Sequence, residues 1–362
     1  MQKRQVKKWI TTVCALAVCG VAAGQVPADI WANIAHRAAL FSVGLQKPEG
    51  SAMVISEKLQ VAAAGKRPTT VLPTFTTPTT TAPTAATTRP AVQTSAPAKD
   101  ANAGVALEQL ISTGDKVAGA VAVRNKSGKV FNFTSELQKK PTFKIQTDTD
   151  NPQVLIVHTH TTEGYLTYDT GYFNPADIAR THDTAKNVCA AGAAIAETLR
   201  AAGVATVQDL TVHDSPKYTG AYSRSEQTVK AALKKYPSVK VVLDIHRDAI
   251  IKNDTTHTKP TAVIDGKKAA QLMIIAGTVS TKELPHPDWQ QNFRFSLQLQ
   301  NALAGKYPDL MRPLYLVASR YNQHLAPGYL LVEVGSDVNT VDEAVYSGKL
   351  LGKTLAEVLK SL

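Results

Sequence analysis

Short apolar runs alternate with longer amphipathic stretches along the chain from Val154 onward. The run Val154–Val157 consists of four consecutive apolar residues, three of them β-branched, which predicts a buried strand. The same reasoning predicts further strands at 204–207, 239–243, 272–276, 314–317 and 329–334, and helices at 185–202, 223–236, 288–306 and 341–360. Strands and helices in alternation predict an α/β fold, with a mostly parallel sheet and helices on both faces.

More local predictions concern the segments around this alternation. The helix at 223–236 opens with Ser223 and has Glu226 three residues later, which is the spacing of a capping box. Residues 100–150 are interpreted as a lead-in segment with a short helix at 105–113 and strands at 117–123 and 130–133. The stretch between the strand that ends at Leu243 and the strand at 272–276 is interpreted as a polar excursion.

Polar residues that can carry chemistry gather where the predicted strands end. They are His158, His160 and Glu163 after the first strand, Asp244, His246, Arg247 and Asp248 around the end of a second, and Glu333 at the end of a third. Ligands of open α/β sheets bind beyond the carboxyl ends of the strands. The pattern therefore predicts one cleft in which histidines and a glutamate form the site of a metal-dependent hydrolase.

Zinc is the metal that this set of residues favours. It binds neutral imidazole and carboxylate, and its catalytic sites keep three protein ligands and one open position. His158 and His160 are two residues apart, so at a strand-to-loop junction one can ligate while the other lines the pocket. Glu333 is bounded by apolar residues, where a carboxylate is costly to bury unless it is paired, and we interpret it as the general base. Asp183 lies just before the predicted helix at 185–202, so capping of that helix can explain this residue without any role in the chemistry.

The amino-terminal segment has the order of an export signal. Four cationic residues precede an apolar run at 9–24, namely Lys3, Arg4, Lys7 and Lys8. This run is short for the ~20 residues that a spanning helix needs. The favoured prediction is an uncleaved cell-membrane anchor over residues 1–28, with the catalytic domain outside the cytoplasm. A signal cleaved after the small residues at 22–24 is the alternative.

Composition divides the rest of the chain. Residues 29–65 are a short juxtamembrane region, and residues 66–99 are dominated by Thr, Pro and Ala. A segment of the latter composition cannot bury enough apolar surface to offset its ordering entropy, so we predict a disordered, extended linker. After the lead-in segment, the catalytic domain is predicted at 151–362.

The formal net charge of +11 narrows the class of partner. In an exported protein, such a charge suits anionic wall or membrane polymers. No motif of interleaved aromatic and basic residues supports nucleic acid as a partner. The three cysteines imply neither a disulfide framework nor a cysteine-rich zinc site.

Five segments give a more specific indication when they are taken in order. They are HTHTTEGY at 158–165, YSRS at 222–225, VLDIHRDA at 242–249, SRYNQHLAPG at 319–328 and LVEVGS at 331–336. Across about residues 117–362 the chain resembles the stage II sporulation protein P family, and the basic anchor and low-complexity linker fit that family too. The family in turn resembles the zinc-dependent N-acetylmuramoyl-L-alanine amidases.

The resemblance implies roles for individual residues. It implies His160, Asp183 and His246 as metal ligands and Glu333 as the catalytic residue. Those amidases have glutamate where Asp183 stands, so Glu163 remains a competing acidic ligand. The remaining candidates are assigned to the pocket: His158, Glu163, Arg247 and His324.

The resemblance also implies a function. It implies a zinc-dependent peptidoglycan hydrolase that cleaves the amide between glycan and stem peptide, with peptide cross-links as a further target. Its setting would be septal wall remodelling and engulfment during endospore formation, with stage II sporulation proteins D and M as partners. Two alternatives stay open: a non-catalytic peptidoglycan-binding scaffold of the engulfment machinery, and a metal-dependent endopeptidase only.

Overall fold

A computed structural model of the protein describes residues 96–112, 114–282 and 284–362. The predicted anchor at 1–28, the juxtamembrane region at 29–65 and nearly all of the predicted linker at 66–99 lie outside the described residues. Among the helices in the described ranges, none combines the length and the apolar character needed to cross a membrane.

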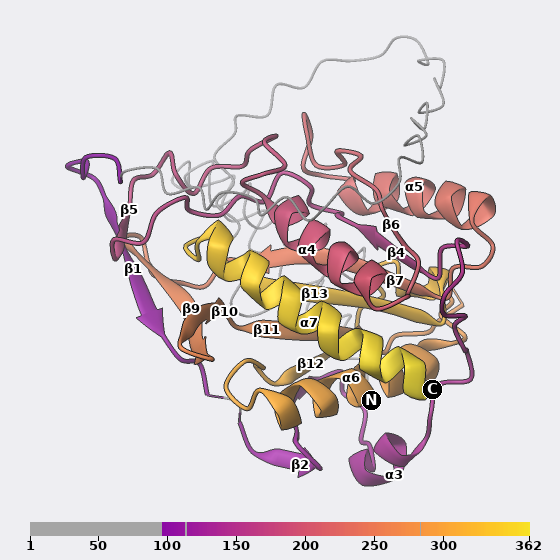
Figure 1. Ribbon diagram of the computed structural model, residues 1–362. Coiled ribbons are helices and arrows are strands. Elements are labelled where there is room, and N and C mark those ends of the chain that lie inside the picture. The colour runs from indigo at the N-terminus through magenta and orange to yellow at the C-terminus, as the bar shows by residue number, and fades with distance from the viewer. Residues whose placement is uncertain (1–95, 113, 283) are drawn as a thin grey trace, which may run out of the picture. The chain divides into compact units, whose positions relative to one another are not determined.

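Eight strands form the larger of two sheets, and this sheet positions the candidate site (Figure 1). The strands are β2 (Lys116–Ala118), β3 (Val121–Lys126), β4 (Val154–Val157), β6 (Thr206–Gln208), β7 (Val241–Asp248), β11 (Leu272–Gly277), β12 (Leu314–Val317) and β13 (Gly328–Ser336). Their order across the sheet is β2-β3-β12-β11-β13-β7-β4-β6. Neighbours are parallel except β2 with β3 and β11 with β13, which are antiparallel.

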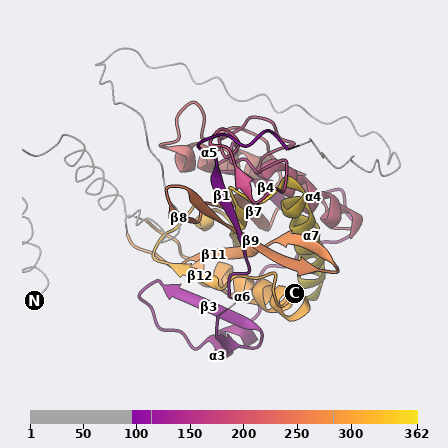
Figure 2. The same cartoon turned by 90° about the vertical axis from the view of Figure 1, so that its left-hand side faces the viewer.

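A second, five-stranded sheet lies beside it in the same unit. Its strands are β1 (Gly104–Gln109), β5 (Tyr172–Phe173), β8 (Ile251–Asn253), β9 (Thr256–Ile264) and β10 (Lys267–Ala270). β1 pairs with β9 in parallel and with β5 in antiparallel orientation, and Figure 2 shows β1 alongside β9. β9 also pairs in antiparallel orientation with β8 and β10. The lead-in segment therefore supplies strands to both sheets.

The prediction of a mostly parallel sheet is wrong, because both sheets are mixed. The stretch interpreted as a polar excursion contains β8, β9 and β10, and the short turns between them permit only antiparallel pairing. The predicted helix at 105–113 is also wrong, since β1 occupies its first half and pairs on both sides. No strand forms at 130–133, where α3 (Phe133–Gln138) begins instead.

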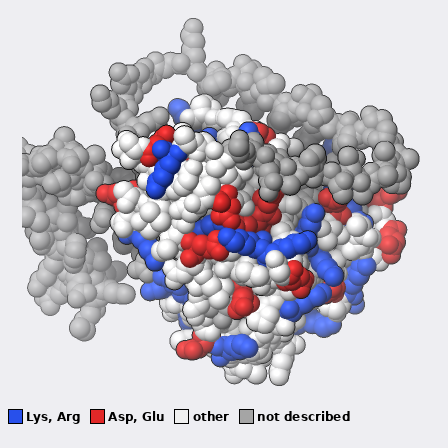
Figure 3. Space-filling model, turned by 60° about the vertical axis from the view of Figure 1, so that its left-hand side comes forward, with Lys and Arg blue, Asp and Glu red and all other residues white. Residues whose placement is uncertain are grey.

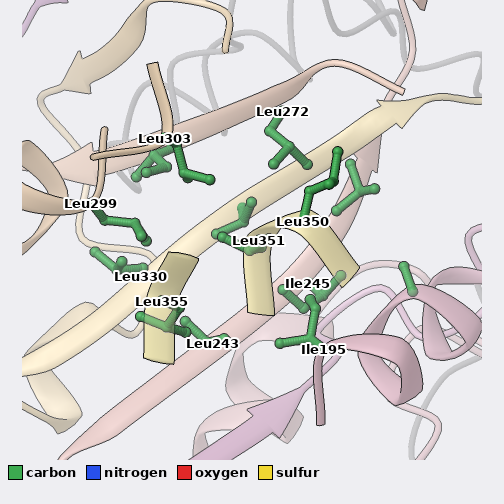
Figure 4. Close-up of a cluster of buried hydrophobic side chains, with 14 of the residues drawn as sticks. Ile195, Leu243, Ile245, Leu272, Leu299, Leu303, Leu330, Leu350, Leu351 and Leu355 are labelled. Carbon is green, nitrogen blue, oxygen red and sulfur yellow. The ribbon is translucent and has the colours of Figure 1, made fainter. Parts of the chain in front are cut away.

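Helices cover both faces of the larger sheet, as predicted. On one face lie α4 (Val188–Ala201), α6 (Trp289–Lys306) and α7 (Val341–Ser361). Figure 4 shows this core, in which Ile195 of α4 and Leu351 of α7 meet Leu243 and Ile245 of β7. On the other face, α5 (Ala221–Lys235) packs Val229 against a smaller cluster that includes Val242 and Tyr329. Successive side chains of β7 point to opposite faces of the sheet, so alternate residues pack against the helices on the two faces.

The start of α5 differs from the prediction. The capping box predicted at Ser223 is wrong, because α5 begins at Ala221 after an N-cap glycine, Gly220, with φ of 86° and no side-chain cap. A capping box does form at α7, where Thr340 accepts from the Glu343 N–H and Glu343 accepts from the Thr340 N–H. Each bond satisfies an amide that the helix itself leaves unpaired.

A buried lysine links the second sheet to α7. Lys259 of β9 is 2% exposed, and its Nζ lies 2.7 Å from both Asp169 Oδ1 and Glu343 Oε1 and 3.4 Å from Glu108 Oε2. Lys268 shares Glu108 and Asp169 at the surface, at 2.6 and 2.9 Å. The carboxylates of Glu108, Asp169 and Glu343 are close enough to one another to hold a metal cation. The ammonium groups of Lys259 and Lys268 already supply the positive charge there. On the face drawn in Figure 3, acidic and basic side chains lie side by side.

We expect Lys259→Met to destabilise the fold by about 3–5 kcal/mol, because removing one partner leaves buried carboxylate charge uncompensated. The matched control is Lys268→Met, which loses contacts to two of the same carboxylates from a side chain that is 43% exposed. That change should cost no more than about 1 kcal/mol. Urea unfolding of both variants measures the difference, and equal midpoints would show that the buried lysine is not a stabilising link.

Candidate metal centre

Three adjacent strands of the larger sheet, β13, β7 and β4, bring the candidate residues together. His160 follows the carboxyl end of β4, and His246 lies near the end of β7. Glu333 of β13 is the Cα partner of His246. Directly paired residues point to the same face of a sheet, so the side chains of His246 and Glu333 share a face.

The side chains of His160, Glu163 and His246 form a buried cluster. One ligand atom from each can be chosen so that the three atoms lie within 4.8 Å of one another. The residues are 8%, 5% and 3% exposed. Within the described ranges, only one other group of acidic or histidine side chains meets this distance, and it is the lysine-filled set around Lys259.

A turn and a tyrosine orient His160. The N–H of Glu163 donates to His160 O at 3.1 Å and closes the turn after β4. The Tyr218 ring stacks on the imidazole with centroids 4.5 Å apart, and its hydroxyl lies 3.1 Å from Nε2. The other nitrogen, Nδ1, is buried without a hydrogen-bond partner. Burial lowers the pKa of His160 to about 4, which favours the neutral form that binds metals.

Glu163 is held as a carboxylate by its neighbours. The N–H of Arg247 donates to Oε2 at 3.1 Å, and Nη2 of Arg180 lies 3.6 Å from Oε1. Burial alone would raise the pKa of Glu163, but His246, His160 and Arg247 together lower it below its usual range. The side chain therefore remains ionised inside the protein, as a metal ligand must be.

His246 lies between two carboxylates. Its Nδ1 is 3.5 Å from Glu163 Oε2, and its Nε2 is 3.0 Å from Asp244 Oδ1. Asp244 is fully buried and accepts hydrogen bonds from the N–H and hydroxyl of Thr159 and from the Tyr329 hydroxyl. Burial alone would lower the pKa of His246, but Asp244 and then Glu163 raise it well above the usual value. A carboxylate behind an imidazole is a common way to orient a metal ligand.

One pair of ligand atoms in the cluster has the spacing expected around a zinc ion. Ligand atoms around a tetrahedral ion at ~2.0–2.1 Å are roughly 3.4 Å apart, close to the 3.5 Å between His246 Nδ1 and Glu163 Oε2. The Nδ1 of His160 is buried without a hydrogen-bond partner, so it is available as a ligand atom. Three protein ligands would leave the fourth position open.

Glu333 lies beside the cluster in a different environment. Its side chain is half-buried, and its Oε2 is buried without a hydrogen-bond partner. Burial raises the pKa of Glu333 to about 8, and the carboxylates of Asp248 and Glu163 add to the rise while His246 opposes it. A carboxyl group with a raised pKa next to a possible metal centre is a candidate for proton transfer.

The structure does not bring Asp183 into the cluster. The residue is exposed, its carboxylate lies 3.1 Å from Lys186 Nζ, and its Oδ1 accepts from the Ala185 N–H. The helix α4 begins later than predicted and is capped by Asn187, whose side chain accepts from the Cys189 N–H. Asp183 thus belongs to the surface turn before the helix.

Of the residues predicted to line the pocket, Glu163 is in the cluster and Arg247 contacts it, whereas His158 and His324 lie outside. His158 is fully buried, and its ring nitrogens are 3.1 Å from Ile245 O and 3.0 Å from Gln208 Nε2. His324 lies in the short 3₁₀ helix η1 (Gln323–Leu325), with Nε2 3.5 Å from a carboxylate oxygen of Glu226.

Several residues around the cluster were not predicted from the sequence. Arg180 stacks over the Tyr218 ring at 4.7 Å and forms an ion pair with the buried Asp214. Tyr222 meets the His160 ring edge-on at 5.6 Å. Arg180, Asp214 and Tyr218 lie in loops without a periodic pattern, so no local sequence signal marks them. Asp244, by contrast, is conspicuous in the sequence among the polar residues at its strand end, because it interrupts the apolar run of β7.

A sequence model of the family described as stage II sporulation protein P (SpoIIP) matches residues 81–359 of this chain. The chain is also similar to stage II sporulation protein P of Bacillus subtilis (strain 168), with 32% identity over 209 residues. That match covers 55% of this chain and 49% of the relative, so the chain spans about half the length of the curated relative it matches.

Among solved structures, the chain is similar to the CwlD amidase from Clostridioides difficile, solved in complex with the GerS lipoprotein. The TM-score is 0.34 at 13% identity, over 57% of this chain and 97% of that one. It is also similar to the N-acetylmuramoyl-L-alanine amidase AmiC2 of Nostoc punctiforme, with a TM-score of 0.32 at 11% identity over 58% of this chain and 96% of that one.

Proposed function

This chain belongs to the stage II sporulation protein P family, and on that premise we propose that it is a zinc-dependent peptidoglycan hydrolase. The observation that carries the proposal is the buried cluster of His160, Glu163 and His246 with Glu333 beside it. A peptidoglycan-binding scaffold would have no use for three buried ligand atoms gathered within 4.8 Å of one another.

The acidic ligand in this proposal is Glu163. Its carboxylate is within reach of both histidines, is held ionised by its surroundings and is oriented by the backbone N–H of Arg247. Asp183, the other acidic candidate, is exposed and paired with Lys186. Glu163 lies three residues after His160, so one turn presents both side chains.

The residues of the cluster have separable roles. When bound, zinc supplies a Lewis acid that polarises the amide carbonyl and acidifies water. His160, Glu163 and His246 would hold it, and Asp244 orients the His246 ring from behind. Glu333 takes a proton from the attacking water and later delivers one to the leaving nitrogen. Tyr218 keeps the His160 ring in place through the stack and the contact at Nε2.

We propose the amide between the glycan lactyl group and the stem peptide as the principal bond cleaved, with peptide cross-links as a second target. A metal-dependent endopeptidase acting on the cross-links only is the alternative within the hydrolases. The same site could serve either substrate, because both reactions are metal-assisted hydrolyses of an amide.

The test is mass analysis of the fragments that the purified full chain releases from purified peptidoglycan. We expect glycan fragments without peptide and stem peptides with a free amino-terminal residue, and we expect release to stop with a chelator and to resume with zinc. Cleavage confined to the cross-links would favour the endopeptidase. Wall binding without any release, with zinc present, would favour the scaffold.

The setting of this activity is likewise a proposal. We place the enzyme at the cell membrane through residues 1–28, with residues 66–99 as a spacer and residues 151–362 as the catalytic domain outside the cytoplasm. The lead-in segment at 100–150 is counted with that domain because its strands pair with β9 and β12. Stage II sporulation proteins D and M are the proposed partners during septal remodelling and engulfment.

A further inference from the structure

The segment 318–327 has an unusual backbone and contributes no residue to the metal-binding cluster. It contains two consecutive residues in the left-handed region, Tyr321 with φ of 46° and Asn322 with φ of 59°. Asparagine adopts this conformation readily, but a bulky side chain does so only at a steric cost. Strain of this kind persists where the surroundings impose it, and it is concentrated at functional sites.

Side-chain amides hold the segment in this conformation. Asn322 donates to Tyr222 O at 2.9 Å, which fastens the segment to α5. Gln323 accepts from the Gly277 N–H at 2.8 Å, which fastens it to the end of β11. Asn292 of α6 donates to Gln323 O at 2.9 Å. Three elements therefore impose a backbone that an aromatic residue would not adopt by itself.

The strained residue covers the sheet face that carries the proposed catalytic carboxylate. The Tyr321 ring packs against the apolar cluster of Met273, Ile275, Tyr315, Val317 and Leu331. Leu331 is two residues before Glu333 on β13, so the two side chains share a face. Burial raises the pKa of Tyr321 to about 12, and the Glu333 carboxylate adds to that rise, which agrees with their proximity.

A second tyrosine connects this ring to the metal-binding cluster. The rings of Tyr222 and Tyr321 have centroids 5.6 Å apart and are tilted by 44°. The Tyr222 ring is nearly parallel to the His246 imidazole, at 6.3 Å and 14°. Both tyrosines are half-buried, so part of each remains accessible. The tyrosine pair, Tyr222 and Tyr321, thus extends from a proposed metal ligand across the sheet face beside Glu333.

The geometry points to Tyr321 as a specificity-determining residue that stacks against a sugar ring of the glycan strand beside the scissile amide. This inference rests on the proposed function and adds the part of the substrate that is recognised. A pyranose ring has flat faces of C–H groups that can pack on the accessible part of an aromatic ring, whereas a peptide of small side chains offers no such face. The amide in question joins sugar to peptide, so a sugar must lie next to Glu333 during cleavage.

The test measures binding in the full chain carrying Glu333→Gln, so that neither probe is consumed. The probes are the peptide-free disaccharide of N-acetylglucosamine and N-acetylmuramic acid, and the sugar-free stem peptide. Adding Tyr321→Gly should weaken disaccharide binding about tenfold, the order expected for one lost stacking contact, and should leave peptide affinity and zinc content unchanged. Glycine adopts positive φ without strain, so the segment keeps its backbone.

Two further variants separate the ring from the loop. Tyr321→Phe retains the ring and should bind the disaccharide within about threefold of the parent. Tyr321→Asn suits the left-handed backbone, lacks the ring and should behave like Tyr321→Gly. Equal weakening of both probes, or no measurable disaccharide binding by the parent, would overturn the inference. Failure of the proposed function would show differently, as a chain that binds the disaccharide through Tyr321 but neither holds zinc nor releases fragments.

Discussion

Replacing Glu333 by glutamine should leave zinc bound and slow the hydrolysis of purified peptidoglycan by a factor on the order of 10²–10⁴, the usual contribution of an acid-base group. Glutamine keeps the shape of the side chain and removes its basicity. The site should bind metal as before, because the ligands are His160, Glu163 and His246. Zinc content and hydrolysis rate are measured in the same preparation.

The matched control for this change is Glu357→Gln. Glu357 lies on α7, is exposed and pairs with Lys306 at 2.6 Å, so the same chemical substitution should leave the rate within about twofold. Excess zinc distinguishes the two roles that a glutamate can have here. If Glu333 were a ligand, Glu333→Gln would lose metal and added zinc would restore much of the activity, and the general base would then be assigned to Glu163.

Replacing His246 by alanine should abolish both zinc binding and hydrolysis. The substitution removes one of three ligands and leaves Glu163 and Asp244 without the imidazole that lies between them. A site with two remaining ligands no longer offers the coordination that zinc requires. Metal analysis of the purified variant, followed by the peptidoglycan assay, measures both effects. The near-ultraviolet circular dichroism spectrum checks that the variant is folded.

Asp183→Ala is the informative control for the His246 variant. Asp183 is exposed and pairs with Lys186, so its loss should leave zinc content and rate close to those of the parent. Full zinc stoichiometry in His246→Ala would remove that histidine from the metal centre. Loss of zinc in Asp183→Ala would instead return the acidic ligand to the position that the family resemblance implied.

The sequence by itself determined the elements whose patterns are local. The apolar run at 154–157, the runs at 272–276 and 314–317, and the long amphipathic stretch from Val341 all formed as predicted, as β4, β11, β12 and α7. Buried parallel strands read as continuous apolar runs, and long helices repeat their apolar face over several turns. Signals of this kind do not depend on what packs against them.

Only the tertiary structure decided the second sheet and the mixed pairing. The sequence pattern predicts a helix at β1 and a polar excursion at β8 to β10, because polar residues such as Lys259 and Lys267 interrupt these strands and no apolar run marks them, although most of β9 is buried. Strand formation there depends on the partner: β1 is a strand since β9 and β5 pair with its two edges. The context dependence of strand propensity makes such segments hard to predict.

The candidate site likewise combines residues that local sequence patterns indicate with residues that only the folded chain brings together. His160, His246 and Glu333 could be singled out as candidates because polar residues directly after or within apolar strands are conspicuous in the sequence. The positions of the two acidic candidates depend on where a loop turns: Glu163 folds back beside His160, and Asp183 stays at the surface. Tyr218 reaches the His160 ring from a position 58 residues later. Contacts between residues so far apart in the sequence form only when the chain folds, so they cannot be predicted from residue types or local spacing.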